Sequence, residues 1–172
     1  MAVLPVLRYP SRILKQVAPS GPARPDAQLA TDLIDTMRAS PGCIGLAAPQ
    51  VGVATRAFAI DLSVLRRPVP THGLGGLFEP EVLVAEGVEV KREGCMSVPD
   101  FTCDVRRAAT LVVRGTDATG RVRVLETSGL EARAVQHEVD HLDGLLILDR
   151  VASVRTDVHP RRRYAAPGEH LR

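Results

Sequence analysis

The amino-acid sequence predicts an α+β fold in which short, mostly antiparallel β-sheets pack around one central helix. Stretches rich in β-branched residues recur at positions 82–85, 88–91 and 110–125. The last stretch is interrupted by turn-forming residues at 117–120, which indicates a hairpin and therefore antiparallel pairing. A well-marked helical pattern follows this β-rich block at residues 128–144, and grouped strands followed by a helix are typical of the α+β class. A chain of 172 residues is long enough to bury the core of one domain.

Two helical segments are expected before the strands. Prolines within the first twenty residues leave room for only one short turn, near residues 11–16. Residues 26–39 keep a helical period of apolar side chains, and Asp26 can cap the first turn. We expect this longer helix to pack on a sheet.

A segment rich in small residues, 41–52, comes next. Glycine and alanine let the backbone approach another group closely, so this segment is either a ligand-contacting loop or a tight connection before a strand. A strand is expected at residues 57–60. Frequent proline and glycine predict a long loop at residues 61–80.

Composition excludes several classes of function. A net charge of +2 gives no case for DNA binding, and 3% aromatic residues without tryptophan cannot supply a platform for stacking bases. No stretch approaches the roughly 20 consecutive apolar residues of a membrane span. Three cysteines, an odd number, and no signal peptide favour the reducing cytoplasm. We therefore expect a cytoplasmic protein that contacts neither DNA nor a membrane.

The helix expected at residues 128–144 has marked ends. Ser128 is a favourable N-cap, and Glu131 three residues later would complete a capping box. Gly144 stands where a left-handed residue ends a helix. Apolar residues recur between these ends at a helical period, beginning with Leu130, and form a stripe that should face the core.

Two histidines lie on that apolar stripe. His137 and His141 are one turn apart with Glu138 beside the first, which gives the pattern His-Glu-x-x-His. This spacing directs two imidazoles at one metal ion and supplies a carboxylate as general base. The alternative is a helix with two satisfied core histidines and an exposed glutamate. A shared cation would satisfy both buried imidazoles at once, which favours the metal site.

A catalytic metal site of this kind needs a third protein ligand. Ile147 stands where a metzincin would have its third histidine, Glu169 lies in a tail with no structural signal, and His72 lies in a loop rich in proline and glycine. Cys95 follows a strand and is preceded by Gly94, which permits close backbone approach. A thiolate suits iron, cobalt, nickel or zinc, so we favour Cys95 as a ligand over a buried, inert thiol.

Three segments resemble, in order and spacing, the signature motifs of peptide deformylases. They are Cys-Ile-Gly-Leu-Ala-Ala-Pro-Gln at residues 43–50, Glu-Gly-Cys-Met-Ser at 93–97 and Gln-His-Glu-Val-Asp-His at 136–141. Residues 9–14 are also similar to the opening segment of that family. The resemblance covers residues 4–150.

The resemblance implies a hydrolase that removes the N-formyl group from N-formylmethionine of newly synthesised proteins. It implies one divalent metal ion per chain, Fe²⁺ by preference, with Zn²⁺, Ni²⁺ or Co²⁺ as alternatives. Cys95, His137 and His141 would be its ligands. A water on this ion would attack the formyl carbon, with Glu138 first as general base and then as general acid.

The motif match also implies roles for residues around the metal. The side chain of Gln50 and the backbone N–H of Met96 would bind the oxyanion. The substrate backbone would pair with the protein as an added strand. Substrate contacts are expected from Ile44, Gly45, Leu46, Glu93, Gly94 and Arg133, the last at the rim of the methionine pocket.

Some positions depart from the usual family pattern. Cys43 replaces an initial glycine, Met96 replaces a commoner leucine, and Glu79 precedes Pro80 where asparagine is more typical. None of these changes removes a catalytic group, so we expect an active enzyme.

The expected catalytic domain spans residues 1–150, followed by a basic, partly mobile tail at 151–172. The tail arginines at 161–163 are either a solvated end or a docking surface for an acidic partner such as the ribosome. We expect a monomer acting on N-formylmethionyl nascent peptides. There are two alternatives to a deformylase. One is another metallo-amidase or peptidase with the same site, and the other is a metal-binding protein without turnover. The latter is disfavoured because a structural site normally has four protein ligands.

Overall fold

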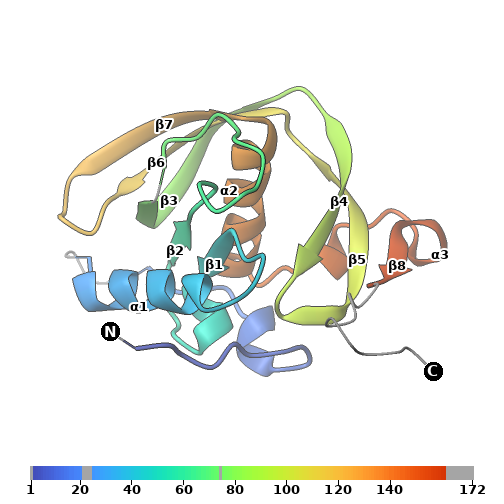
Figure 1. Ribbon diagram of the computed structural model, residues 1–172, viewed down its shortest axis with the longest axis horizontal. Helices are drawn as coiled ribbons and strands as arrows, with labels where there is room; N and C mark the ends of the chain where they lie inside the picture. Colours follow the sequence, from blue (N-terminus) through green and yellow to red (C-terminus); the bar gives the residue numbers. More distant parts are fainter. Residues whose placement is uncertain (1, 21–24, 74, 162–172) are drawn as a thin grey trace.

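In the computed structural model, the described residues are 2–20, 25–73 and 75–161. Within these residues, two antiparallel sheets flank a central helix, α2 (Gly129–Leu142), as Figure 1 shows. This arrangement confirms the predicted α+β class, with the histidine-bearing helix at its centre.

The first sheet lies on one side of α2 and has the strand order β1-β2-β3-β6-β7. The predicted strand at 57–60 and the predicted hairpin are both present in it. β1 is an edge strand, because it pairs only with β2. The bounds are β1 (Gly45–Ala47), β2 (Ala57–Ile60), β3 (Gly75–Glu86), β6 (Thr110–Thr116) and β7 (Val122–Ser128).

The second sheet lies on the other side of α2 and has the order β4-β5-β8. β4 and β5 form a hairpin that turns at Met96 and Ser97, and β8 pairs with the outer side of β5 through Thr102 and His159. β4 is therefore an edge strand of this sheet, with β8 at the other edge. The bounds are β4 (Glu89–Cys95), β5 (Val98–Arg107) and β8 (Val158–Pro160).

The predicted N-terminal helices are present. A 3-10 turn, Arg12–Lys15, occupies the short helical segment, and α1 (Ala27–Arg38) occupies the longer one. The carboxylate of Asp26 accepts hydrogen bonds from the backbone N–H groups of Gln28 and Leu29, as expected of an N-cap. α1 buries its apolar face against β1 and β2.

The predicted ends of α2 need one correction. Ser128 is the N-cap residue but makes no side-chain capping bond, and Glu131 does not reach back to it. Instead, buried Glu131 accepts hydrogen bonds from the Thr71 hydroxyl and the His72 backbone N–H, so the preceding loop takes the place of a capping box. Gly144 has φ +71° and ends the helix as predicted.

Two other predictions differ from the structure. The loop predicted at 61–80 is too long, because β3 already begins at Gly75 and passes through Glu79 and Pro80 with a shift in register between Phe78 and Glu81. Leu130 is 37% exposed rather than on the buried face. The tail up to residue 161 forms α3 (Val154–Asp157) and β8, while residues 162–172 lie outside the described part of the chain.

Separate apolar clusters lie on the two sheets. On one side, Phe58, Leu111 and Val113 of the first sheet pack on the helix. Near the second sheet, Val105 packs with Ile147, which follows the helix and is fully buried. The first of these clusters contains residues of α2 and packs the helix on the first sheet. No helix in the described part of the chain is long and apolar enough to cross a membrane.

Candidate metal centre

The three predicted ligands meet where the end of β4 reaches α2. The sulfur of Cys95 and one ring nitrogen from each of His137 and His141 all lie within 4.8 Å of one another. Cys95 Sγ is 3.3 Å from Nε2 of His141, and the two imidazole rings stand edge to face with centroids 5.0 Å apart. We call Cys95, His137 and His141 the metal centre.

The protonation chemistry of these groups fits a divalent cation. Burial alone would raise the pKa of the Cys95 thiol, but the charge of His141 and hydrogen bonds from both histidines hold it well below its ordinary value. A thiolate with two imidazoles is a donor set that binds zinc or ferrous iron. Nδ1 of His141 is also buried without a hydrogen-bond partner among the described residues. Buried polar atoms normally have a partner, so the hydrogen bonding of this site is incomplete.

Glu138 lies beside the metal centre as a buried, incompletely satisfied carboxylate. Its Oε2 has no hydrogen-bond partner among the described residues. Burial raises the pKa of Glu138 to about 7, against the attraction of His137 and His141. A carboxyl group whose pKa lies near neutrality can both accept and return a proton, as general acid–base catalysis requires.

Gln50 points its amide nitrogen at the metal centre. Its Oε1 accepts a hydrogen bond of 2.9 Å from the backbone N–H of Ala47, which fixes the orientation of the amide. Nε2 then lies 3.7 Å from Cys95 Sγ and 3.2 Å from the hydroxyl oxygen of Ser97. A donor is therefore aimed at the region where an oxyanion would form. Met96 follows Cys95 in the hairpin turn, and its side chain packs against the apolar cluster that contains Leu33 and Met37 of α1.

Gly45 brings β1 next to Glu138. A Cβ on this glycine would overlap Oε1 of Glu138 and would lie 3.0 Å from its Cδ. The thiol of Cys43 donates to the carbonyl oxygen of Gly45 at 3.0 Å, and burial raises the pKa of Cys43 to about 12, so this thiol stays protonated. The carbonyl oxygen of Gly45 keeps a second lone pair, which can accept a hydrogen bond from another partner. Ile44 is half-buried, whereas the side chain of Leu46 is fully buried in the core, which leaves only its backbone for a substrate.

Glu93 is committed to the protein rather than to a substrate. Its Oε2 is 2.9 Å from Nδ1 of His137, and both its oxygens accept from the guanidinium of Arg107 at 3.0 Å. Burial would raise the pKa of Glu93, but these hydrogen bonds lower it to about 2. Glu93 therefore holds the imidazole of His137 with its other ring nitrogen directed to the metal centre, an outer contact typical of metal-ligating histidines.

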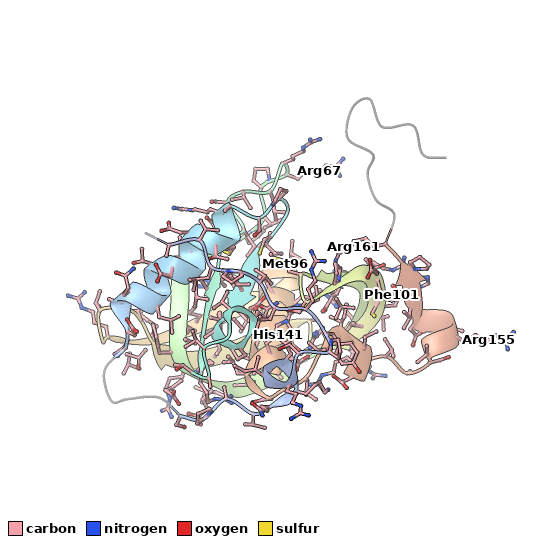
Figure 2. The ribbon with its side chains drawn as sticks, turned by 90° about the horizontal axis from the view of Figure 1, so that it is seen from below. Arg67, Met96, Phe101, His141, Arg155 and Arg161 are labelled. Carbon is pink, nitrogen blue, oxygen red and sulfur yellow. The ribbon has the colours of Figure 1, made fainter. Side chains whose placement is uncertain are left out.

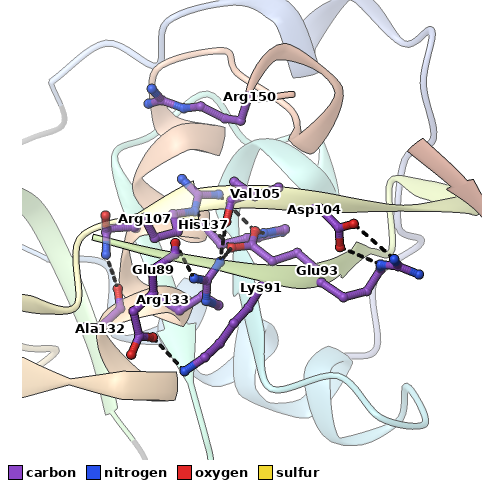
Figure 3. Close-up of polar contacts among 12 residues, drawn as sticks. Glu89, Lys91, Glu93, Asp104, Val105, Arg107, Ala132, Arg133, His137 and Arg150 are labelled. Atoms are coloured by element: carbon purple, nitrogen blue, oxygen red, sulfur yellow. Dashed lines mark hydrogen bonds and ion pairs between the residues drawn. The ribbon is translucent and has the colours of Figure 1, made fainter. Parts of the chain in front are cut away.

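Arg133 was expected at the rim of the methionine pocket, but its side chain is buried. Its guanidinium donates to Glu93 at 2.7 Å and to the carbonyl oxygens of Val105 and Glu89 (Figure 3). These atoms are engaged inside the protein, and only its Nε lacks a partner among the described residues.

Arg133 belongs to a buried charge network that the sequence did not predict. The network consists of Glu93, Arg107, Arg133 and Asp140. Arg107 on β5 bridges Glu93 on β4 to Asp140 on α2. The exposed Arg150 adds a second cation to Asp140 from the outside. The missed signal is the alternation of β5. Cys103 and Val105 point inward, so Arg107 must do so as well.

The sequence matches a known family over most of its length. A family model described as polypeptide deformylase matches residues 3–157.

The chain belongs to the polypeptide deformylase family.

Individual relatives agree with that assignment. The peptide deformylase of Thermodesulfovibrio yellowstonii is 38% identical to this chain, over 94% of the chain and 97% of the relative. That of Alkalilimnicola ehrlichii is 42% identical, over 90% of the chain and 85% of the relative.

Solved structures of the family share the fold. A class I type b peptide deformylase from Acinetobacter baumannii, bound to Met-Ala-Ser, has a TM-score of 0.79 at 33% identity and covers 87% of this chain and 99% of its own. A peptide deformylase from Legionella pneumophila has a TM-score of 0.79 at 31% identity, covering 90% and 89%. Peptide deformylases are hydrolases, and the donor set of the metal centre is consistent with such an enzyme.

Proposed function

We propose that this chain removes the N-formyl group from N-formylmethionine at the start of newly synthesised proteins. The observation that carries the proposal is the buried carboxylate of Glu138, whose Oε2 has no partner among the described residues and which lies beside a thiolate and two imidazoles. A site built only to hold a metal has no use for such a carboxylate. Membership of the deformylase family supports the same activity.

The proposed metal is ferrous iron, held by Cys95, His137 and His141. The resemblance to the family favours iron, while zinc, nickel and cobalt also accept one thiolate and two imidazoles. A divalent cation bound there would lower the pKa of a water molecule and polarise the formyl carbonyl. Glu93 supports this assignment, because it holds the ring of one ligand, His137, in place.

Glu138 is proposed to move the protons of the reaction. It takes one from the attacking water and later delivers one to the leaving amine of methionine. The Gln50 amide and the backbone N–H of Met96 donate hydrogen bonds to the oxygen that gains negative charge. The bond between Gln50 and Ala47 supports this role, because it orients the amide before substrate arrives.

The substrate peptide is proposed to lie as an extended strand along the edge strands β1 and β4. Both edges border the metal centre, since Gly45 contacts Glu138 and β4 ends at Cys95. The backbones of Ile44, Gly45 and Leu46 on one side and of Gly94 on the other would pair with the peptide. Glu93 and Arg133 would act from behind this surface, by supporting the wall of the methionine pocket.

The remaining expectations concern the protein in the cell. We propose that it works in the cytoplasm as a monomer, which agrees with its three free cysteines, Cys43, Cys95 and Cys103. The domain boundary after residue 150 and a transient ribosome contact of the tail stay predictions.

A deformylation assay on anaerobically purified protein, with metal analysis of the same sample, tests the proposal. We expect turnover of formyl-Met-Ala-Ser, little or none of acetyl-Met-Ala-Ser, and about one equivalent of metal. Equal turnover of both peptides would instead identify a broader metallo-amidase. Bound metal without turnover of either peptide would show that the chain binds metal but is not an enzyme for these substrates.

Cys95→Ser tests the third ligand in the same experiment. Loss of the thiolate should lower metal content after dialysis, whereas Cys103→Ala removes another buried thiol and should leave metal content unchanged. An unchanged metal content in Cys95→Ser would place the third ligand elsewhere.

A further inference from the structure

One side chain of the C-terminal segment returns to the edge of the metal centre. β8 pairs with β5, and the backbone N–H of Arg161 donates to the carbonyl oxygen of Asp100 at 2.8 Å, which fixes where this side chain begins. Its guanidinium then covers Gly94, since a Cβ on that glycine would overlap Nη2 and lie 3.1 Å from Cζ. Nη2 also approaches the carbonyl oxygen of Cys95 at 3.4 Å. In Figure 2, Arg161 lies on the same side of the molecule as Met96.

The charge of Arg161 is not neutralised by any carboxylate within ion-pair distance among residues 2–20, 25–73 and 75–161. By contrast, Arg92 of β4 is paired with Asp104 at 2.7 Å, and Arg107 of β5 is paired with two buried carboxylates. A guanidinium has five N–H donors, and towards the described residues Arg161 uses only one of them, in a long contact. The group is half-buried, so its remaining donors can reach a molecule that arrives from outside.

The position of Gly94 decides which part of a substrate would meet this cation. The side chains of Glu93 and Cys95 point to the buried face of β4. Gly94 lies between them, so the position of its missing side chain, which Arg161 covers, is on the outer face. In a peptide extended along the free edge of β4, side chains alternate between these two faces. With the methionine side chain on the buried face, the side chain of the second residue falls on the outer face, as a cross-strand neighbour of Gly94.

We propose that Arg161 is a specificity-determining residue that favours an acidic side chain at the second position of the formyl-methionyl peptide. A carboxylate there can accept two hydrogen bonds from the guanidinium, a geometry that lysine cannot reproduce. This inference rests on the proposed deformylase function and on the strand-like placement of the substrate.

Three substrates that differ only at the second residue test the inference. They are formyl-Met-Glu-Ser-amide, formyl-Met-Gln-Ser-amide and formyl-Met-Lys-Ser-amide, with the C-terminus amidated so that no terminal carboxylate competes. At low salt we expect the glutamate peptide to exceed the glutamine peptide in kcat/KM by about threefold, as exposed ion pairs typically allow. The difference should lie in KM and should shrink as salt is added.

Three variants locate the source of this preference. Arg161→Gln should reduce the ratio between the glutamate and glutamine peptides to about one, while Arg161→Lys should keep part of it. Arg155→Gln is the matched control, because Arg155 is an exposed arginine of the same segment at the far end of the molecule (Figure 2). It should leave the ratio as in the original chain.

Either of two results overturns the inference. One is an unchanged ratio in Arg161→Gln. The other is an equal fall for all three peptides, which would mean that Arg161 only holds β8 in place. Calorimetric titration with the product peptides Met-Glu-Ser-amide and Met-Gln-Ser-amide gives the same comparison without turnover. Failure of the proposed function is distinguishable, because the original chain would then process none of the formyl peptides.

Discussion

The environment of Glu138 determines what this side chain can do. Its carboxylate is buried against Gly45 and next to two imidazoles, and its Oε2 has no bond to any described residue. A buried carboxylate with no structural partner destabilises a protein, so its presence is explained better by chemistry than by folding.

Replacing Glu138 with glutamine tests the chemical role of its carboxylate, because the two side chains have nearly the same volume. Glu138→Gln should bind metal as before and remain folded, yet lose deformylation by a factor on the order of 10²–10⁴, because the amide cannot take up a proton. The measurement is kcat/KM for formyl-Met-Ala-Ser together with metal content. Glu126→Gln changes an exposed glutamate and should leave both values unaltered. A Glu138→Gln enzyme working at the original rate would contradict the proposed mechanism.

Single residues of the site were predictable to different degrees. His137, Glu138 and His141 followed from helical spacing, and Cys95 from elimination and from its motif. The burial of Arg133 was not predictable, because its partner Glu93 is brought to it only by the pairing of β4 with β5. A sequence shows that a residue is charged, whereas its partners depend on contacts made across the fold.

At the scale of elements, the edge strand β1 and the helix α2 are in direct contact at Gly45. No other amino acid fits there without moving Glu138, since any Cβ would overlap its Oε1. The glycine is needed for close approach and not for an unusual φ, because its backbone lies in the ordinary range.

Gly45→Ala should therefore displace the carboxylate of Glu138. We expect kcat/KM for formyl-Met-Ala-Ser to fall by about 100-fold, the effect of moving a catalytic group by about 1 Å, with metal content retained. Gly75→Ala is a matched control at the first residue of β3, where a Cβ would meet nothing within 4 Å. Full activity in Gly45→Ala would show that Glu138 can relax without cost.

Elements with a local signal were predicted well. The cap of α1 and the turn between β6 and β7 are encoded by neighbouring residues, and both are present. β5 was missed because Pro99 stands near its start and charged residues interrupt its outer face. β8 is only three residues long and exists because it pairs with β5, so no local pattern could reveal it.

For the whole molecule, the buried charge network connects the second sheet to the central helix. Arg107 contacts carboxylates from β4 and from α2, so one side chain joins both elements. Removing one member of a buried ionic group leaves its partners desolvated and unpaired, which is far more costly than losing an exposed pair.

Arg107→Met should lower the free energy of unfolding by about 3 kcal/mol. Arg114→Met is the control, because it breaks an exposed pair with Glu81 and should cost no more than about 1 kcal/mol. Urea denaturation of the two metal-loaded variants gives the comparison. Equal losses would mean that apolar packing, and not the network, holds the second sheet to α2.

The partition of the strands into two sheets was beyond sequence reasoning. Several strands, such as β2, β6 and β7, could be recognised from their own residues. Their distribution between two sheets depends on pairings between distant segments, such as β3 with β6. The class of the fold was accessible, whereas the existence of two free edges beside the metal centre required the structure.

The order of the ligands along the chain also determines when the metal centre can form during synthesis. The ribosome releases Cys95 about 40 residues before His137, an interval of roughly 2–8 s at typical elongation rates. During this time β4 and β5 can already pair, but the sulfur of Cys95 has no histidine beside it. β8 and Arg161 emerge later than both histidines, so Arg161 can cover Gly94 only after both histidines exist. Each new enzyme molecule thus acquires its metal ligands first and the cation at their outer edge afterwards.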